Sequence, residues 1–142
     1  MLHHVRARLA IVALCLLALG AASVNSLRAQ TQTPTQIFTA YRATLARATA
    51  YAELFPFMES RGRAMIEGIP EPQRGGMFSL LKRFADTYSE VAVAGETVTG
   101  DTAVLSLTGK DTKGQPAAGS VPMTREADGW KVGTERWSSR PR

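Results

Sequence analysis

The sequence is short of the side chains on which much enzyme chemistry depends. Its 142 residues contain two histidines and one cysteine, and all three (His3, His4 and Cys15) lie within the first 29 residues. If that segment is removed, the remaining chain has neither an imidazole nor a thiol. This excludes a Ser-His-Asp triad, a thiol nucleophile, a disulfide framework and a zinc site built on nitrogen or sulfur ligands. We therefore predict no metal site, no cofactor and no catalytic residue.

Net charge is also small once the first segment is set aside. The whole chain has 17 basic and 12 acidic residues and a formal net charge of +5. Three of the bases, Arg6, Arg8 and Arg28, lie in residues 1–29, which contain no acid. The rest of the chain therefore has a net charge of about +2. Such a surplus favours an ordinary solvated surface, and we predict no nucleic-acid partner.

The first thirty residues have the pattern of a secretory signal peptide. Basic residues precede an apolar run over 9–22, and a small and polar stretch follows up to Ala29. As a helix this run would span roughly 21 Å, less than the ~30 Å hydrocarbon core of a bilayer. We predict a cleaved signal over 1–29, export to the periplasm or the medium, and no stable membrane anchor in the mature form. A retained single-pass anchor is the alternative.

The chain after this leader begins with a helix signal. Thr33 is a hydroxyl cap, Pro34 suits the first helical position, and Gln36 follows three residues after the cap. Apolar residues then recur at spacings of three and four up to Pro56, where a boundary or kink is expected. The predicted inward face of this helix is Phe38, Tyr41, Leu45, Ala48, Ala52 and Phe55.

Two further helices are predicted before the sequence changes character at Ser89. The first covers roughly 57–67 and ends at a Gly-Ile-Pro sequence. The second covers roughly 77–88, and its apolar side is Met77, Leu80, Leu81, Phe84 and Tyr88.

The second half of the chain predicts four antiparallel strands. Residues that favour a pleated surface become frequent there, and turn signals separate them. Gly100-Asp101 closes a hairpin between 90–99 and 102–110, and Asp128-Gly129 closes another between 120–126 and 130–137. Helices followed by consecutive hairpins make an α+β domain, with N-terminal helices packed on a curved four-stranded antiparallel sheet. The domain covers 30–137, and 138–142 form a flexible tail.

The two hairpins resemble the nuclear transport factor 2-like superfamily. The matching segments are Gly100–Leu105 (GDTAVL) and Ala127–Val132 (ADGWKV), which are similar to those of small exported bacterial members without an assigned function. The resemblance implies a cystatin-like or nuclear transport factor 2-like domain in which a long first helix and a bent sheet together form a cone. The open end of the cone is a pocket in some members of the superfamily and a dimer contact in others.

Aromatic residues are the candidates for a binding site or an interface. They are frequent in the helical half, and a surplus beyond the needs of the core would line an apolar cavity or a contact surface. Trp130 and Trp137 lie an odd number of residues apart on the last predicted strand, so a regular strand places them on opposite faces. The one on the outer side would be a surface tryptophan or an anchor for a partner. The candidate residues are Tyr41, Tyr51, Phe84, Tyr88, Trp130 and Trp137.

These features favour an exported, non-enzymatic module that binds a small apolar ligand or a second copy of itself. Two alternatives remain. One is an isomerase- or lyase-like enzyme that uses a carboxylate, Asp86 or Glu53, with a tyrosine, although no residue of this chain matches such an enzyme's motif. The other is a scaffold subunit of an envelope assembly.

Overall fold

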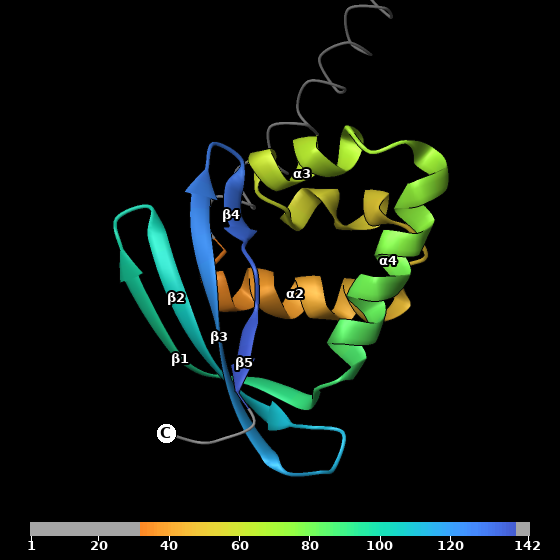
Figure 1. Ribbon diagram of the computed structural model, residues 1–142. Helices are drawn as coiled ribbons and strands as arrows, with labels where there is room; N and C mark the ends of the chain where they lie inside the picture. Colours follow the sequence, from red (N-terminus) through yellow and green to blue (C-terminus); the bar gives the residue numbers. More distant parts are fainter. Residues whose placement is uncertain (1–31, 139–142) are drawn as a thin grey trace, which may run out of the picture.

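The computed structural model describes residues 32–138. The predicted leader, and the predicted tail apart from Ser138, lie outside the described residues. Helical elements come first and strands second, which confirms the α+β class (Figure 1). The elements are α2 (Pro34–Arg47), η1 (Tyr51–Phe57), α3 (Ser60–Glu67), α4 (Glu71–Asp86), β1 (Ser89–Thr99), β2 (Thr102–Lys110), β3 (Pro116–Glu126), β4 (Gly129–Val132) and β5 (Arg136–Ser138).

The first helix starts where the sequence predicts and stops sooner. The Thr33 hydroxyl accepts from the Gln36 N–H at 3.2 Å, and the Gln36 side chain accepts from the Thr33 N–H at 2.9 Å. The helix ends at Arg47 and not near Phe55. Glu53 explains the early end, because its carboxylate accepts the Thr49 N–H at 2.7 Å and starts the 3₁₀ helix η1. The Lys82 ammonium donates to two carbonyls at the end of α2.

The core lies between α2 and one face of the sheet. Phe38 and Leu45 are each 2% exposed, and opposite them Leu105 and Val121 are fully covered. Each such side chain contributes about 1.5–3 kcal/mol when it is fully buried. Alternate residues of β2 and β3 face this core, whereas Val104, between two of them, is 50% exposed. The sheet therefore has one buried face and one face open to water.

The predicted fourth strand is interrupted, which corrects the number of strands to five. The sheet order is β1-β2-β3-β4, and β5 also pairs with β3. Two residues of β3, Val121 and Pro122, lie between its β4-paired and β5-paired stretches, whereas three residues, 133–135, separate β4 from β5. The additional residue acts as a β-bulge and shifts the pairing by one position. Pro122 favours a break there because it has no N–H for the ladder, and its carbonyl accepts the Gly133 N–H at 2.9 Å.

The bulge places both tryptophans on the helix-facing side of the sheet. Trp130 lies opposite Arg125, and Trp137 lies opposite Gly119. These two β3 positions point to the same side as Val121 in the core. The prediction that one tryptophan lies on the outer side is therefore wrong, because it assumed a regular strand.

The last two helices differ from the prediction in their bounds, and α4 also differs in which of its sides is buried. α3 begins at Ser60, because residues up to Phe57 belong to η1, and α4 begins at Glu71, ahead of the predicted start. In Figure 1, α4 stands to one side of the other helices. Its buried residue is Phe78, whose ring contacts the Tyr51 ring edge-on, with the two ring centroids 5.3 Å apart. Three residues of its predicted apolar side are exposed instead: Met77, Leu80 and Phe84.

The packing of Trp137 on the sheet predicts that Gly119 cannot carry a side chain. A Cβ at that position would lie 2.7 Å from the Trp137 ring and 3.0 Å from the Arg136 carbonyl oxygen. We expect Gly119→Ala to lower the free energy of unfolding by about 1–3 kcal/mol, measured by urea denaturation.

Gly75→Ala is the matched control for this experiment. A Cβ at Gly75 meets nothing within 4 Å, and alanine inside α4 should raise stability by about 0.5–1 kcal/mol. A Gly119→Ala protein as stable as the parent would contradict the described position of Trp137.

Candidate functional site

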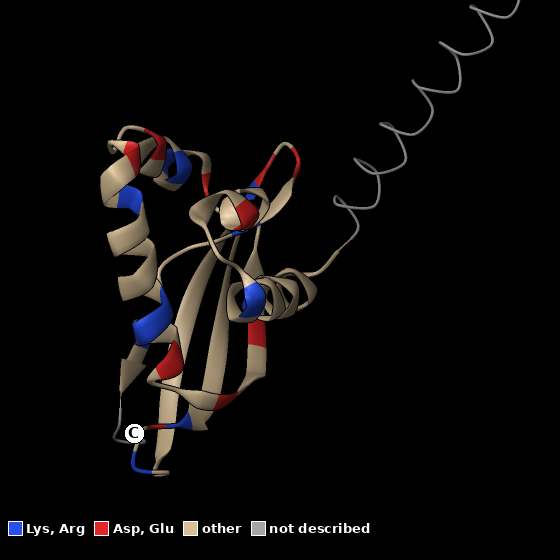
Figure 2. Cartoon of the chain, turned by 90° about the vertical axis from the view of Figure 1, so that its right-hand side faces the viewer, with Lys and Arg blue, Asp and Glu red and all other residues tan. Residues whose placement is uncertain are grey.

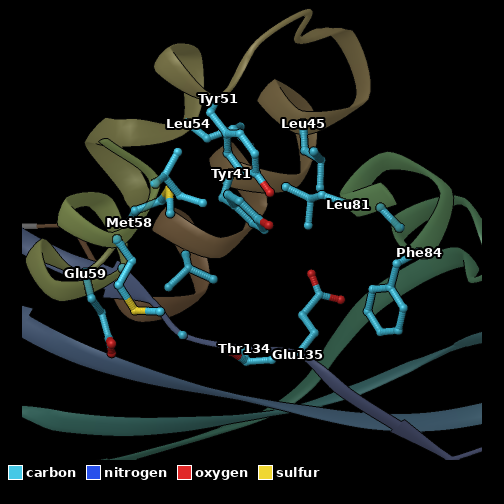
Figure 3. Close-up of a pocket in the computed structure, with 16 residues that line it drawn as sticks. Tyr41, Leu45, Tyr51, Leu54, Met58, Glu59, Leu81, Phe84, Thr134 and Glu135 are labelled. Atoms are coloured by element: carbon cyan, nitrogen blue, oxygen red, sulfur yellow. The ribbon is translucent and has the colours of Figure 1, made fainter. Parts of the chain in front are cut away.

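A cavity of about 340 Å³ lies between the helices and the end of the sheet. Figure 3 shows side chains from α2, η1, α3, α4 and the β4–β5 connection pointing into it. The cavity opens to solvent between α3 and α4, because Met65 and Phe84 line it and are 67% and 47% exposed.

The walls of the cavity are mainly apolar. They bring together side chains from each helical element, and three of these, Tyr41, Leu45 and Leu54, also belong to the core. The apolar lining residues are Leu45, Leu54, Met58, Met65, Ile66, Leu81, Phe84, Ala85 and Val132. A volume of this size and lining suits a small organic molecule.

A carboxylate, that of Glu135, projects into this apolar space (Figure 3). Its side chain is 8% exposed and lies 3.5 Å from the Arg42 guanidinium. The other carboxylate oxygen accepts the Trp137 indole N–H at 2.9 Å. The bulge between β4 and β5 brings Glu135 to this place, since it belongs to the three-residue segment that the ladder leaves out.

Two tyrosines point toward the same space as Glu135 (Figure 3). Burial raises the pKa of Tyr41 to about 12, and the negative charge of Glu135 adds to that rise while Arg42 opposes it. The Tyr41 hydroxyl therefore keeps its proton and stays a hydrogen-bond donor at any physiological pH. Burial also raises the pKa of Tyr51, whose hydroxyl donates to the Met77 carbonyl at 3.4 Å.

A row of aromatic rings supports the side of the cavity near Glu135. The Tyr88 and Trp137 rings stack with centroids 4.4 Å apart, and Phe84 meets Tyr88 edge-on at 6.3 Å. This row fixes the indole that donates to Glu135 and holds Phe84 at the mouth of the cavity.

The six candidate residues occupy three different places. Tyr41, Tyr51 and Phe84 line the cavity. Tyr88 and Trp137 lie behind it, in the aromatic row. The remaining candidate, Trp130, is 3% exposed, and the Arg125 guanidinium lies 4.5 Å from the centroid of its ring, outside the cavity lining.

The two carboxylates that the enzyme hypothesis named do not line the cavity. Glu53 is an exposed cap, and hydrogen bonds from Thr49 lower its pKa. Asp86 is exposed at the end of α4, beside a separate small hollow near Arg42. Sequence reasoning missed Glu135 because it placed this residue on a regular strand. The signal that could have found it is Pro122, a proline within a predicted strand.

No protein-family model matches the sequence, and no curated protein matches it. Among solved structures, the chain is similar to an NTF2-like protein of unknown function from Shewanella baltica OS155. The identity is 14%, the match covers 79% of this chain and all of the other chain, and the TM-score is 0.41.

Each helix within residues 32–138 is too short or too polar to span a lipid bilayer. No group of three or more His, Cys, Asp or Glu side chains in that range could hold a metal ion.

The raised pKa of Tyr41 predicts a loss of stability in alkali. An unfolded tyrosine ionises near 10.0, whereas folded Tyr41 ionises near 12. Between these values the native state binds more protons than the unfolded state, so the free energy of unfolding falls as the pH rises. We expect a loss of a few kcal/mol across this interval in urea denaturation.

Tyr41→Phe tests the assignment of this effect. In the variant, the free energy of unfolding should fall less over the same pH interval, because there is no hydroxyl at that position to ionise. If parent and variant lose stability in parallel, Tyr41 is not the buried group that the structure describes.

Proposed function

We propose that this domain binds a small, mainly apolar molecule in the cavity between α2, α3, α4 and the β4–β5 connection. The observation that carries the proposal is the cavity itself, whose apolar walls surround one buried carboxylate and the hydroxyl of Tyr41. Apolar walls provide affinity, and a few placed polar groups fix the orientation of a ligand. From the leader of the sequence, we further propose that it does so after export.

The arrangement of α4 supports binding in preference to a purely structural role. Leu81 and Ala85 of α4 line one wall of the cavity, and Leu81 does not reach the opposite side (Figure 3). The rings of Tyr41, Tyr51 and Phe84 line the same space and leave it open. The same open mouth would admit a ligand without unfolding of the core formed by α2 and the sheet.

Filling the cavity should abolish binding. Gly62 on α3 lines the cavity, and a Cβ there would meet only the flexible end of Met58, at 3.7 Å. Gly62→Leu therefore adds a side chain to the cavity with little strain on the backbone. We expect it to weaken the binding of the neutral apolar fluorophore N-phenyl-1-naphthylamine by about tenfold or more, measured by fluorescence titration.

Gly76→Leu is the control with the same change in a helix. Gly76 lies on α4 outside the cavity lining, and a Cβ there meets nothing within 4 Å. This variant should bind the fluorophore like the parent. Failure of the parent to bind, or equal binding by both variants, would refute the cavity as the site. Native mass spectrometry of the parent shows whether the domain forms a dimer, and whether the added fluorophore shifts the dimer to monomer.

A second candidate function is acid–base catalysis on a bound ligand. Glu135 favours it, since a carboxylate that is 8% exposed shares the cavity with the neutral hydroxyl of Tyr41. A carboxylate can take a proton from a substrate while a tyrosine hydroxyl donates a hydrogen bond to the oxygen that becomes negative. The two functions differ in what the protein releases. A binding module returns its ligand unchanged on denaturation, whereas an enzyme returns an isomer or a dehydrated product, which mass spectrometry and NMR identify.

A further inference from the structure

The charge inside the cavity indicates what kind of polar group a ligand carries. Among the described residues that line the cavity, the charged ones are Glu59 and Glu135, and none is Lys, Arg or His. The two carboxylates lie at opposite sides of the space (Figure 3). Glu59 already accepts the Thr124 hydroxyl at 2.8 Å, so Glu135 is the acid that faces the apolar interior.

Glu135 is incompletely neutralised by its protein partners. Its 3.5 Å separation from Arg42 exceeds the 2.7–2.9 Å that is typical of a charge-assisted hydrogen bond. Its second bond comes from a neutral indole. An ionised carboxylate offers about four acceptor positions, and these two partners use one on each oxygen. The remaining positions are available to a ligand.

The charge of Glu135 also acts on a neighbouring group in the cavity. Burial is the main cause of the raised pKa of Tyr41, Glu135 adds to the rise, and Arg42 opposes it by less. Of the two charges, the negative one therefore has the larger effect at that hydroxyl, which favours a cation beside it. Figure 2 shows both basic and acidic residues along α4, which borders the cavity.

We infer that the cavity selects apolar molecules that end in an ammonium group, with that group bound to Glu135 between Tyr41 and Phe84. An ammonium donates up to three hydrogen bonds and can approach the carboxylate more closely than Arg42, which lies 3.5 Å away. Tyr41 and Phe84 line the same cavity, and aromatic rings attract a cation. An apolar molecule that ends in a carboxylate would place two negative charges together in a space of low polarity and be rejected.

This inference rests on the proposed binding function, and three probes with one apolar body test it. Octylamine, 1-octanol and octanoate differ in their polar ends at neutral pH, where they are cationic, neutral and anionic. Each is titrated into the protein with bound N-phenyl-1-naphthylamine, and displacement is followed by fluorescence. We expect octylamine to displace the fluorophore at about one tenth of the concentration that 1-octanol needs, and octanoate to be the weakest.

Two carboxylate variants locate the preference. Glu135→Gln keeps the shape of the side chain and an acceptor for Trp137, and should reduce octylamine to the level of 1-octanol. The affinity of each variant for the fluorophore is measured first, and each displacement is corrected for it. Glu59→Gln, at the opposite side of the cavity, is the matched control and should keep the preference. The fluorophore reports in every variant whether the cavity is still formed.

The outcomes separate the two proposals. If neither the fluorophore nor any probe binds, the proposed function fails. If the fluorophore binds but the three probes compete equally, or octanoate is the strongest, the cavity binds ligands without the inferred selectivity. If octylamine remains preferred in Glu135→Gln, another group provides the selectivity and the role given to Glu135 is wrong.

Discussion

The hydrogen bond between the Pro122 carbonyl and the Gly133 N–H holds the floor of the cavity in its bulged form. A Cβ at Gly133 would lie 2.8 Å from that same carbonyl oxygen, so the close approach requires glycine. The resulting extra residue between β4 and β5 turns Glu135 toward the helices and places Trp137 beneath it. Without this bulge, a regular strand would carry Trp137 to the outer face, and the carboxylate would lose the indole that anchors it.

One part of the molecule forms the stable core, and another part borders the open mouth of the cavity. α2 and η1 are held by the buried face of the sheet, with Phe38, Leu54 and Leu105 almost fully covered. α4 is held through Phe78, whose ring contacts Tyr51, and through Lys82, which donates to two carbonyls at the end of α2, while much of its apolar surface is exposed. Because the core does not depend on the outer part of α4, the space between α4 and α3 can remain open.

Much of the fold could be predicted from the sequence because local signals determined it. The Thr33–Gln36 capping box fixed the start of α2, and Gly100, with a positive φ of 60°, closes the hairpin between β1 and β2. The end of α2 could not be predicted from apolar spacing, since it depends on the hydrogen bonds that Glu53 makes back to Thr49.

The site was only partly accessible to sequence reasoning. Tyr41, Tyr51 and Phe84 were found because aromatic residues beyond the needs of a small core must line a space or a surface. Glu135 was missed because its position depends on a single inserted residue, and a shift of one reverses the direction of every side chain that follows. The exposed stripe of α4 was missed for a related reason, since spacing identifies an apolar face but not what covers it.

The most direct test compares the two indole N–H resonances by NMR in the parent and in Glu135→Gln. The chain has two tryptophans, so Trp130 provides an internal comparison. Because the Trp137 indole donates to the Glu135 carboxylate at 2.9 Å, its resonance should move clearly when that charged acceptor becomes a neutral amide, while the Trp130 resonance stays in place. If the Trp137 resonance is the same in parent and variant, its indole does not bind Glu135, and the bulged floor of the cavity is wrong.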